Sequence, residues 1–250
     1  MITRVKTPAE IEAMRGGGKA LGTILLELKS QTKIGMSTLD IANIARKLIS
    51  GMGMEPAFLG YQGFPDVICI SVDEEIVHGV PRADRIIEDG SVIKLDLGIK
   101  HKGMIVDGAI TIVAGETTKE VSQLLERTKT SLDRGINAVK DGCRVGDIGF
   151  AIESYANQFN YGIIRDLVGH GVGHEVHEDP NIPNYGKKGS GMDLQAGMTI
   201  AIEPMLTLGK EDVAVLEDGW TIISRDGSIG CQFEHTVLVT KNGFEILTKA

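Results

Sequence analysis

Four acidic residues lie within or at the end of apolar runs that have the composition of β-strands. A carboxylate in such a run costs free energy unless a partner compensates for its burial. One acid alone can be an edge-strand charge or a residue at the end of a hairpin, but four of them in one chain favour a shared site. The four are Asp96, Asp107, Glu203 and Glu234.

The strand pattern around Glu203 indicates where its carboxylate points. Side chains alternate along a strand, so Glu203 lies on the face opposite Ile200 and Ile202, away from a helix-covered side. Carboxylates that converge repel one another and take up protons unless cations lie between them. The charges of four carboxylates balance those of two divalent ions. With one imidazole added, such a ligand set is typical of Mn, Fe, Co or Zn dinuclear hydrolytic sites that share a bridging water.

The imidazole is expected from the histidine-rich segment 169–177. His170, His174 and His177 stand at i, i+4 and i+7, which matches the spacing of one helix face. Three glycines and the lack of an H-E-x-x-H motif argue against a zincin helix. Turn histidines without any ligand role are the alternative for this segment taken alone. His78 is a weaker signal and by itself favours a structural role.

Helices and strands must position these side chains, and apolar periodicity predicts them. Thr7 to Glu10 form a capping box before an apolar stripe at helical spacing, and Ser37 to Asp40 cap a second helix. Short β-branched runs bounded by Gly and Pro indicate strands. The predicted helices are one of about six turns from Pro8, then 38–51, 116–140 and 145–159, and the predicted strands include 67–72, 91–97 and 197–203.

The order of elements recurs along the chain. Aligning Gly35 with Gly142 (142 − 35 = 107) brings Asp40 onto Asp147 and residues 90–96 onto 197–203. The repeat predicts two α-β halves related by a pseudo-twofold axis, with a carboxylate at the equivalent strand end of each half. The alternative is chance, because two helix-helix-strand segments can be slid into partial register.

Composition places the chain among globular proteins. Its 250 residues are 42% hydrophobic and 24% charged, which fits one large domain or two small ones. Cys69, Cys143 and Cys231 have no C-x-x-C spacing, which excludes a disulfide framework and a zinc ribbon. The net charge of −8 without a basic run argues against general nucleic-acid binding. With no signal peptide or bilayer-spanning run, we expect a cytosolic protein.

The sequence resembles the methionine aminopeptidases of type I over nearly the whole chain, from Thr7 to Thr248. The resemblance implies the pita-bread fold, of class α+β, in which a curved antiparallel sheet has helices on its outer face and a dinuclear site at its centre. It also implies one catalytic domain over residues 1–250, with pseudo-twofold-related halves of about 1–110 and 111–250. The signature stretches are 56–61, 69–72, 78–81, 96–98, 169–173, 183–186, 198–204 and 233–236.

The resemblance implies a role for each candidate residue. The enzyme would remove N-terminal methionine from nascent proteins and peptides with a small second residue, through a water activated by two divalent ions (Co, Mn, Fe or Zn). Asp107 and Glu234 would bridge the two ions. Asp96 would complete one metal site, and His170 with Glu203 the other. The implied catalytic residues are Glu203, His78 and His177, and the implied substrate contacts are His78, His177, Phe58, Tyr61, Phe64, Cys69 and Trp220.

The type and the partners also follow from the resemblance. Only 33 positions (203 − 170 = 33) separate His170 from Glu203, which leaves no room for the helical insertion of type II enzymes. The chain lacks the N-terminal zinc-binding extension of eukaryotic cytosolic members, so a bacterial-style enzyme is implied. The expected partners are nascent polypeptide N-termini at the ribosome, with no specific nucleic acid and no membrane. The expected state is a cytoplasmic monomer.

Two stretches depart from the family pattern. Ile105 and Val106 precede Asp107 where many members have His-Gly, which keeps the ligand but alters the local strand packing. His174, Glu175 and Val176 replace a basic residue, a small residue and a bulky aromatic one, so the preference at the first or second substrate position stays open.

Two other interpretations are weighed against this one. An Xaa-Pro aminopeptidase or prolidase shares the fold and metals but normally carries an additional N-terminal domain. A non-catalytic pita-bread binding protein has normally lost several ligands, whereas all five are present here.

Overall fold

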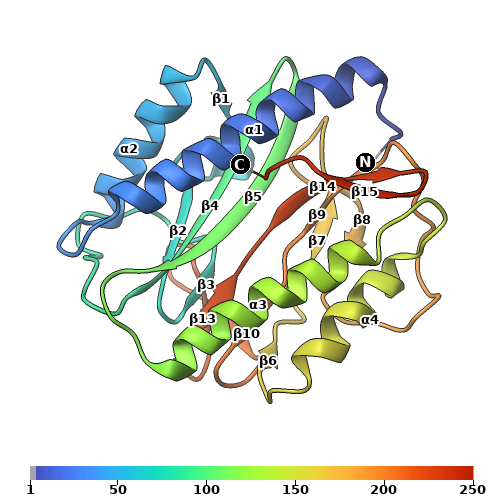
Figure 1. Ribbon diagram of the computed structural model, residues 1–250. Coiled ribbons are helices and arrows are strands. Elements are labelled where there is room, and N and C mark those ends of the chain that lie inside the picture. The colour runs from blue at the N-terminus through green and yellow to red at the C-terminus, as the bar shows by residue number, and fades with distance from the viewer. Residues whose placement is uncertain (1–3, 250) are drawn as a thin grey trace.

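Helices cover one side of a set of antiparallel strands in the computed structural model, which describes residues 4–249 (Figure 1). The long helices α1 and α3 cross this side in front of the strands, each accompanied by a shorter helix. The helices of the described residues are α1 (Pro8–Gln31), α2 (Thr38–Gly51), α3 (Lys119–Asn137) and α4 (Val145–Ala156), with a short 3-10 turn at Tyr61–Gly63.

Local capping explains where the helices begin. The Thr7 hydroxyl accepts a hydrogen bond from the Glu10 N–H, and the Glu10 carboxylate accepts one from the Thr7 N–H. The first two predicted helices are confirmed, including their starts. The predicted helix 116–140 is three residues too long at each end, because Thr118 caps its start. The predicted helix 145–159 ends at Ala156, where i→i+3 hydrogen bonds tighten the chain.

The strands pair antiparallel throughout the described residues and form four hydrogen-bonded sheets. One sheet has the order β1-β4-β2, with β5 paired to β4, and another has the order β15-β14-β9-β7-β8. The smaller sheets are β13-β10-β6 and β11-β12-β3. The strands are β1 (Glu55–Pro56), β2 (Cys69–Val72), β3 (Glu75–Val77), β4 (Val92–His101), β5 (Met104–Val113), β6 (Gly162–Ile163), β7 (Gly169–Gly171), β8 (Glu178–Ile182), β9 (Thr199–Ile202), β10 (Met205–Thr207), β11 (Val213–Val215), β12 (Ile222–Ser224), β13 (Gly230–Gln232), β14 (His235–Thr240) and β15 (Gly243–Ile246).

The two larger sheets meet through the chain between β13 and β14. The Glu234 N–H donates to the Ala109 carbonyl at 2.9 Å, and the Ala109 N–H donates back to Glu234 at 3.4 Å. The Asp107 N–H donates to the Thr236 hydroxyl at 2.9 Å, and that hydroxyl donates to the Asp107 carbonyl at 2.7 Å. These contacts bring the backbone of Asp107 close to that of Glu234 at the centre of the molecule.

The two largest apolar clusters among residues 4–249 lie between the helices and the strands. Leu21 and Ile24 of α1 pack with Leu95 and Leu97 of β4. In the other half, helices α3 and α4 pack on Ile200 and Ile202 of β9 together with the inner residues of β14. Because side chains alternate along β4 and β9, their polar positions face the side away from the helices. The predicted orientation of the strand that precedes Glu203 is therefore confirmed.

Contacts at the helix entrances repeat at the predicted offset. Ser37 forms an isolated bridge with Ile86, and Arg144 forms one with Asp193, with 107 residues between equivalent partners (144 − 37 = 107; 193 − 86 = 107). Helices α2 and α4 start at the same offset, each with an acidic N3 residue that accepts the N-cap N–H. These matches support the proposal of two related halves in one catalytic domain.

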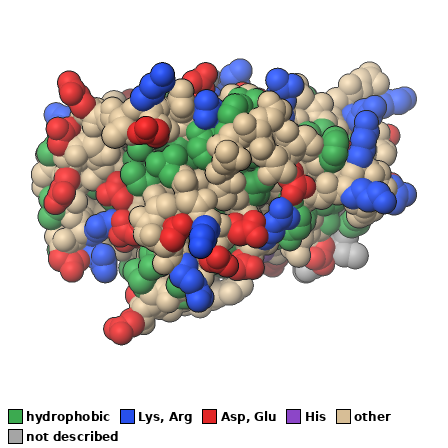
Figure 2. All heavy atoms as spheres, turned by 90° about the horizontal axis from the view of Figure 1, so that it is seen from below, with side chains coloured by type: hydrophobic (Ala, Val, Ile, Leu, Met, Phe, Trp, Pro, Cys, Tyr) green, Lys and Arg blue, Asp and Glu red, His purple; other side chains and the backbone are tan. Residues whose placement is uncertain are grey.

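The lengths of the helices and the charges on the surface bear on binding to membranes and to nucleic acid. No helix among residues 4–249 is both long and apolar enough to cross a membrane. On the face shown in Figure 2, acidic and basic side chains lie side by side around an apolar patch. A surface that carries positive and negative charges side by side attracts a polyanion only weakly.

Candidate metal centre and substrate pocket

One cavity of about 170 Å³ brings together every site residue predicted from the sequence. It opens on the side of β4 and β9 away from the helices, where the apolar cluster of Phe58, Cys69, Val172 and Ala201 lies. Gln62 and Val176 also line it, and neither was predicted as a site residue. The predicted residues in its wall are Phe58, Tyr61, Phe64, Cys69, His78, Asp96, Asp107, His170, His177, Glu203, Trp220 and Glu234.

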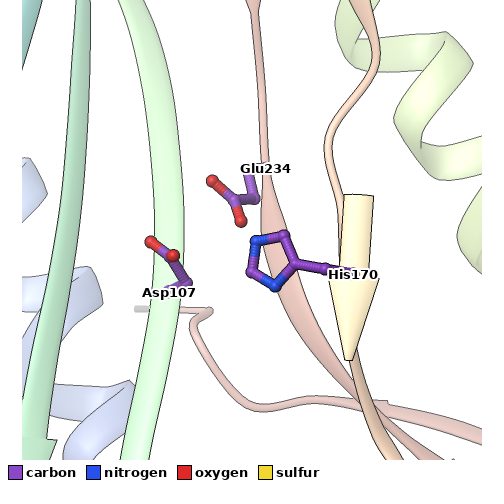
Figure 3. A group of neighbouring side chains, drawn as sticks. All are labelled: Asp107, His170 and Glu234. Atoms are coloured by element: carbon purple, nitrogen blue, oxygen red, sulfur yellow. The ribbon is translucent and has the colours of Figure 1, made fainter. Parts of the chain in front are cut away.

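The carboxylates reach the cavity from four places in the fold. Asp96 and Asp107 lie within the paired strands β4 and β5, whereas Glu203 directly follows β9. Glu234 lies in the break between β13 and β14. The side chains of Asp107, His170 and Glu234 point toward one another (Figure 3), and one potential ligand atom from each lies within 4.8 Å of the others.

Burial and mutual repulsion shape the protonation of these acids. Burial raises the pKa of Asp107 to about 7. Burial and, after it, the neighbouring carboxylates raise the pKa values of Asp96, Glu203 and Glu234 well above their usual range. Oδ1 of Asp96 and Oε1 of Glu234 are buried without a hydrogen-bond partner among the described residues. Unpartnered carboxylate oxygens that surround an imidazole fit divalent cations.

A hydrogen bond fixes the tautomer of His170. Its Nδ1 lies 2.9 Å from the carbonyl of Gly171, an acceptor, so Nδ1 carries the proton and Nε2 keeps its lone pair. Nε2 lies 3.5 Å from Oε1 of Glu203. Burial, followed by the nearby His177, lowers the pKa of His170 to about 3. A neutral imidazole with a fixed tautomer is the form that binds a metal ion.

An unpredicted residue, Gln232, acts on two of the acids. Its Nε2 donates to Oε2 of Glu203 at 3.2 Å, and its side chain lowers the pKa of Asp96 against the raising effect of burial. The Asn184 amide donates to the Glu203 carbonyl at 3.2 Å. The sequence indicated Gln232 in one way. It lies two positions before Glu234 in an extended segment, and residues two apart in such a segment share a face.

Two further histidines face the cavity beside the acids. The ring of His177 lies 4.3 Å from that of His170, and its Nδ1 is 3.0 Å from the Tyr61 hydroxyl. Burial, followed by His177, lowers the pKa of His78 to about 4, and burial lowers the pKa of His177. His78 has a left-handed backbone with φ of 58°, a conformation that histidine adopts more readily than most residues. Both rings are neutral hydrogen-bonding groups near neutral pH.

Aromatic side chains and a thiol form the apolar end of the cavity. The rings of Phe64 and Trp220 meet edge to face with centroids 5.2 Å apart. The Phe58 ring covers Gly98, where a Cβ would lie 2.4 Å from a ring carbon. Cys69 pairs with Asp96 across β2 and β4, so the thiol lies between the apolar wall and the acids. Apolar walls with a sulfur atom suit an unbranched thioether side chain.

The two departures from the family pattern have different places in the structure. Ile105 joins the apolar cluster of the cavity, and Val106 packs under α1. Val176 lines the cavity, whereas the His174 ring binds Glu10 through its Nε2 at 2.9 Å. Of residues 174–176, Val176 is therefore the one that lines the cavity.

Comparisons with known proteins identify the family of this chain. Residues 12–241 match the model of metallopeptidase family M24. Methionine aminopeptidases of Clostridium acetobutylicum (41% identity, 98% of both chains) and Mycoplasma capricolum (42%, 100% of this chain and 99% of that one) are similar over their length. The solved methionine aminopeptidase of Thermotoga maritima superposes with a TM-score of 0.97 at 42% identity, and all of both chains is covered.

The fold and the buried Asp, His and Glu group define a metal-dependent peptidase, and the chain belongs to metallopeptidase family M24. Within the family its relatives and its length are those of type I methionine aminopeptidases, and its activity is the removal of N-terminal methionine. The predicted pita-bread fold and the predicted activity are confirmed.

The solved prolidase of Pyrococcus furiosus bears on the interpretation of the chain as an Xaa-Pro peptidase. It superposes with a TM-score of 0.79 at 26% identity, and the match covers 98% of this chain but 65% of the prolidase. The fold is common to both, whereas full-length similarity at about 40% identity is found with the methionine aminopeptidases. The Xaa-Pro interpretation and the non-catalytic interpretation are therefore set aside.

Proposed function

We propose that the cavity holds two divalent ions on five ligands and uses them to release methionine from nascent chains that have a small second residue. The observation that carries this proposal is the convergence of four carboxylates and one neutral imidazole, where buried oxygens of Asp96 and Glu234 have no hydrogen-bond partner among residues 4–249. Asp107 and Glu234, whose side chains converge with that of His170, would be ligands shared by both ions. Asp96 would be the further ligand of one ion, and His170 and Glu203 would be the further ligands of the other.

Proton transfer is assigned to Glu203. When bound, the two ions lower the pKa of a shared water and so supply a nucleophile near neutral pH. Glu203 lies beside His170 in the cavity, and Gln232 holds its Oε2 at 3.2 Å. Its carboxylate accepts the proton of the nucleophile and passes it to the leaving amide nitrogen, a role that contributes about 10²–10⁴ in rate.

His78 and His177 are assigned to the substrate. Both rings lie at the cavity beside the ligands, and the Tyr61 hydroxyl orients His177 at 3.0 Å. Neutral imidazoles in this position hydrogen-bond the scissile amide and stabilise the charge that develops on its oxygen. We expect His78→Ala to keep full metal content and to lose kcat.

The apolar end of the cavity is assigned to the methionine side chain. Phe58, Tyr61, Phe64, Cys69 and Trp220 surround it, and the free amine of the substrate reaches the acidic end. The preference for a small second residue is proposed from the similarity to the methionine aminopeptidases.

The cellular setting is proposed from the activity. Nascent polypeptide N-termini at the ribosome are the substrates, and the enzyme acts as a cytoplasmic monomer without specific nucleic-acid contacts. The metal is Co, Mn, Fe or Zn, because an oxygen-rich set with one imidazole accepts several first-row ions.

Peptide hydrolysis tests this function. With Mn or Co added, Met-Ala-Ser should be cleaved, and EDTA should abolish cleavage. An Xaa-Pro peptide, an N-acetylated Met-Ala-Ser and a peptide that begins with Leu should each be poor substrates. Equal cleavage of the Leu peptide would contradict the pocket assignment, and equal cleavage of the acetylated peptide would contradict the role of the free amine.

A further inference from the structure

A buried ion pair joins the start of the chain to the cavity wall. Nζ of Lys6 lies 3.0 Å from Oε2 of Glu178, and the two side chains are 0% and 1% exposed. The Lys6 N–H donates to the Gly197 carbonyl at 2.8 Å, which anchors the segment just before β9. The lysine stem lies against Gly173, where a Cβ would be 2.4 Å from Cε of Lys6. The pair therefore needs the close approach that this glycine permits.

The second oxygen of the Glu178 carboxylate binds the turn that precedes it. Oε1 accepts hydrogen bonds from the backbone N–H groups of His174 at 2.7 Å and Glu175 at 3.1 Å. Glu178 is also the first residue of β8 and pairs with Gly171 of β7. One carboxylate thus closes the turn 173–178, and Lys6 neutralises that carboxylate from the other side.

A second contact links this turn to α1. Nε2 of His174 lies 2.9 Å from Oε1 of Glu10, whose other oxygen accepts the Thr7 N–H in the capping box. The hydrogen bonds to the Thr7 backbone, His174 and the Thr7 hydroxyl lower the pKa of Glu10 to about 2, so the carboxylate is charged. The turn is held from the N-terminal segment by Lys6 and from the first helix by Glu10.

The turn carries two side chains of the cavity wall, Val176 and His177. We propose that Lys6 and Glu178 are positioning residues for the peptidase reaction, and that their ion pair fixes the turn 173–178 so that His177 faces the substrate. This inference rests on the substrate role proposed for His177. Neither Lys6 nor Glu178 lines the cavity, so both act through the turn.

The variant Lys6→Met tests the inference, because it keeps an apolar stem against Gly173 and removes the charge that neutralises Glu178. Hydrogen exchange followed by mass spectrometry on the full-length protein should show faster exchange of the His174 and Glu175 amides. In the Mn-loaded enzyme, kcat/KM for Met-Ala-Ser should fall by about tenfold to a hundredfold, as expected when a reacting group is misplaced by about 1 Å. The metal content should not change.

A double-mutant cycle separates positioning from general destabilisation. If Lys6 acts through His177, Lys6→Met should lower kcat/KM by no more than about twofold in the background of His177→Ala. The double variant Lys6→Met with Glu178→Gln removes both charges and keeps an oxygen that accepts the two amides. It should fold even where Lys6→Met does not, and it should recover part of the lost kcat/KM.

Arg15→Met is the matched control. Arg15 also ties α1 to a distant residue, Glu245 of β15 at 2.7 Å, but the pair is exposed. Its loss should change neither kcat/KM nor the exchange of the turn.

Three results would overturn the inference. They are unchanged exchange at residues 174 and 175 in Lys6→Met, an equal loss of kcat/KM in the wild-type and His177→Ala backgrounds, and no recovery in the double variant. A fully active His177→Ala enzyme would instead contradict the proposed substrate role of His177, which makes the two failures distinguishable.

Discussion

The variant Asp107→Asn should stabilise the metal-free protein at the same time as it strongly weakens metal binding. Asp107 is 3% exposed, and its pKa of about 7 is raised from 3.8 chiefly by burial. A raised pKa in the folded state means that folding binds protons, so stability falls as the pH rises between about 4 and 7. The difference of about three pH units between the pKa values of Asp107 in the unfolded and folded states lowers the free energy of unfolding by roughly 4 kcal/mol above pH 7. Asparagine keeps the Oδ1 that accepts the Gly108 N–H at 2.9 Å.

Urea unfolding in EDTA and in Mn provides the assay. In EDTA at pH 8, Asp107→Asn should exceed the wild type in free energy of unfolding by up to about 4 kcal/mol, and the gap should close below about pH 4. When the Mn concentration is about a thousand times the dissociation constant of the wild type, the free energy of unfolding of the wild type should rise by about 4 kcal/mol. That of the variant should rise little. Asp84→Asn, at an exposed aspartate, is the control and should change stability by about 0.5 kcal/mol or less. A variant less stable than the wild type in EDTA at pH 8, or stabilised equally by Mn, would refute the argument that uncompensated charge strains this site.

Four further substitutions separate the proposed roles. His170→Ala should lose one ion together with activity, whereas His177→Ala should keep both ions and lose kcat. Metal analysis of the purified variants measures this difference. The reverse pattern would exchange the ligand role of His170 with the substrate role of His177. Glu203→Gln should lower kcat by about 10²–10⁴ in steady-state assays, so a rate within a few-fold of wild type would exclude Glu203 as the proton carrier. Gly98→Ala places a Cβ 2.4 Å from the Phe58 ring. This variant should raise KM for methionine peptides about tenfold, because overpacking costs about 1–3 kcal/mol. An unchanged KM would show that the Phe58 ring does not border the substrate.

Local patterns explain why much of the site was predictable. Alternation along β4 and β9 puts Leu95, Leu97, Ile200 and Ile202 on the helix side, so the acids next to them had one face left to occupy. The capping boxes before α1 and α2 are equally local and set both helix starts. The roles of His78 and His177, in contrast, came from resemblance to the family and not from any local pattern.

Contacts between distant residues explain what was missed. The apolar run from Cys231 to Val239 looks like one strand, but it breaks at Glu234, whose backbone pairs with Ala109. The pair of Lys6 and Glu178 joins positions 172 residues apart, and neither residue stands in a recognisable motif. The missed cap at Thr118 is different, because a threonine three positions before Val121 was visible in the sequence.

Metal stoichiometry tests the central claim most directly. Metal-free protein titrated with Mn and measured by native mass spectrometry should bind two ions per chain, with Met-Ala-Ser hydrolysis appearing as the ions bind. Asp107→Ala and Glu234→Ala should each weaken both ions, because each of these carboxylates bridges the pair in our proposal. Two ions bound as tightly in either variant as in the wild type would contradict the bridging dinuclear centre.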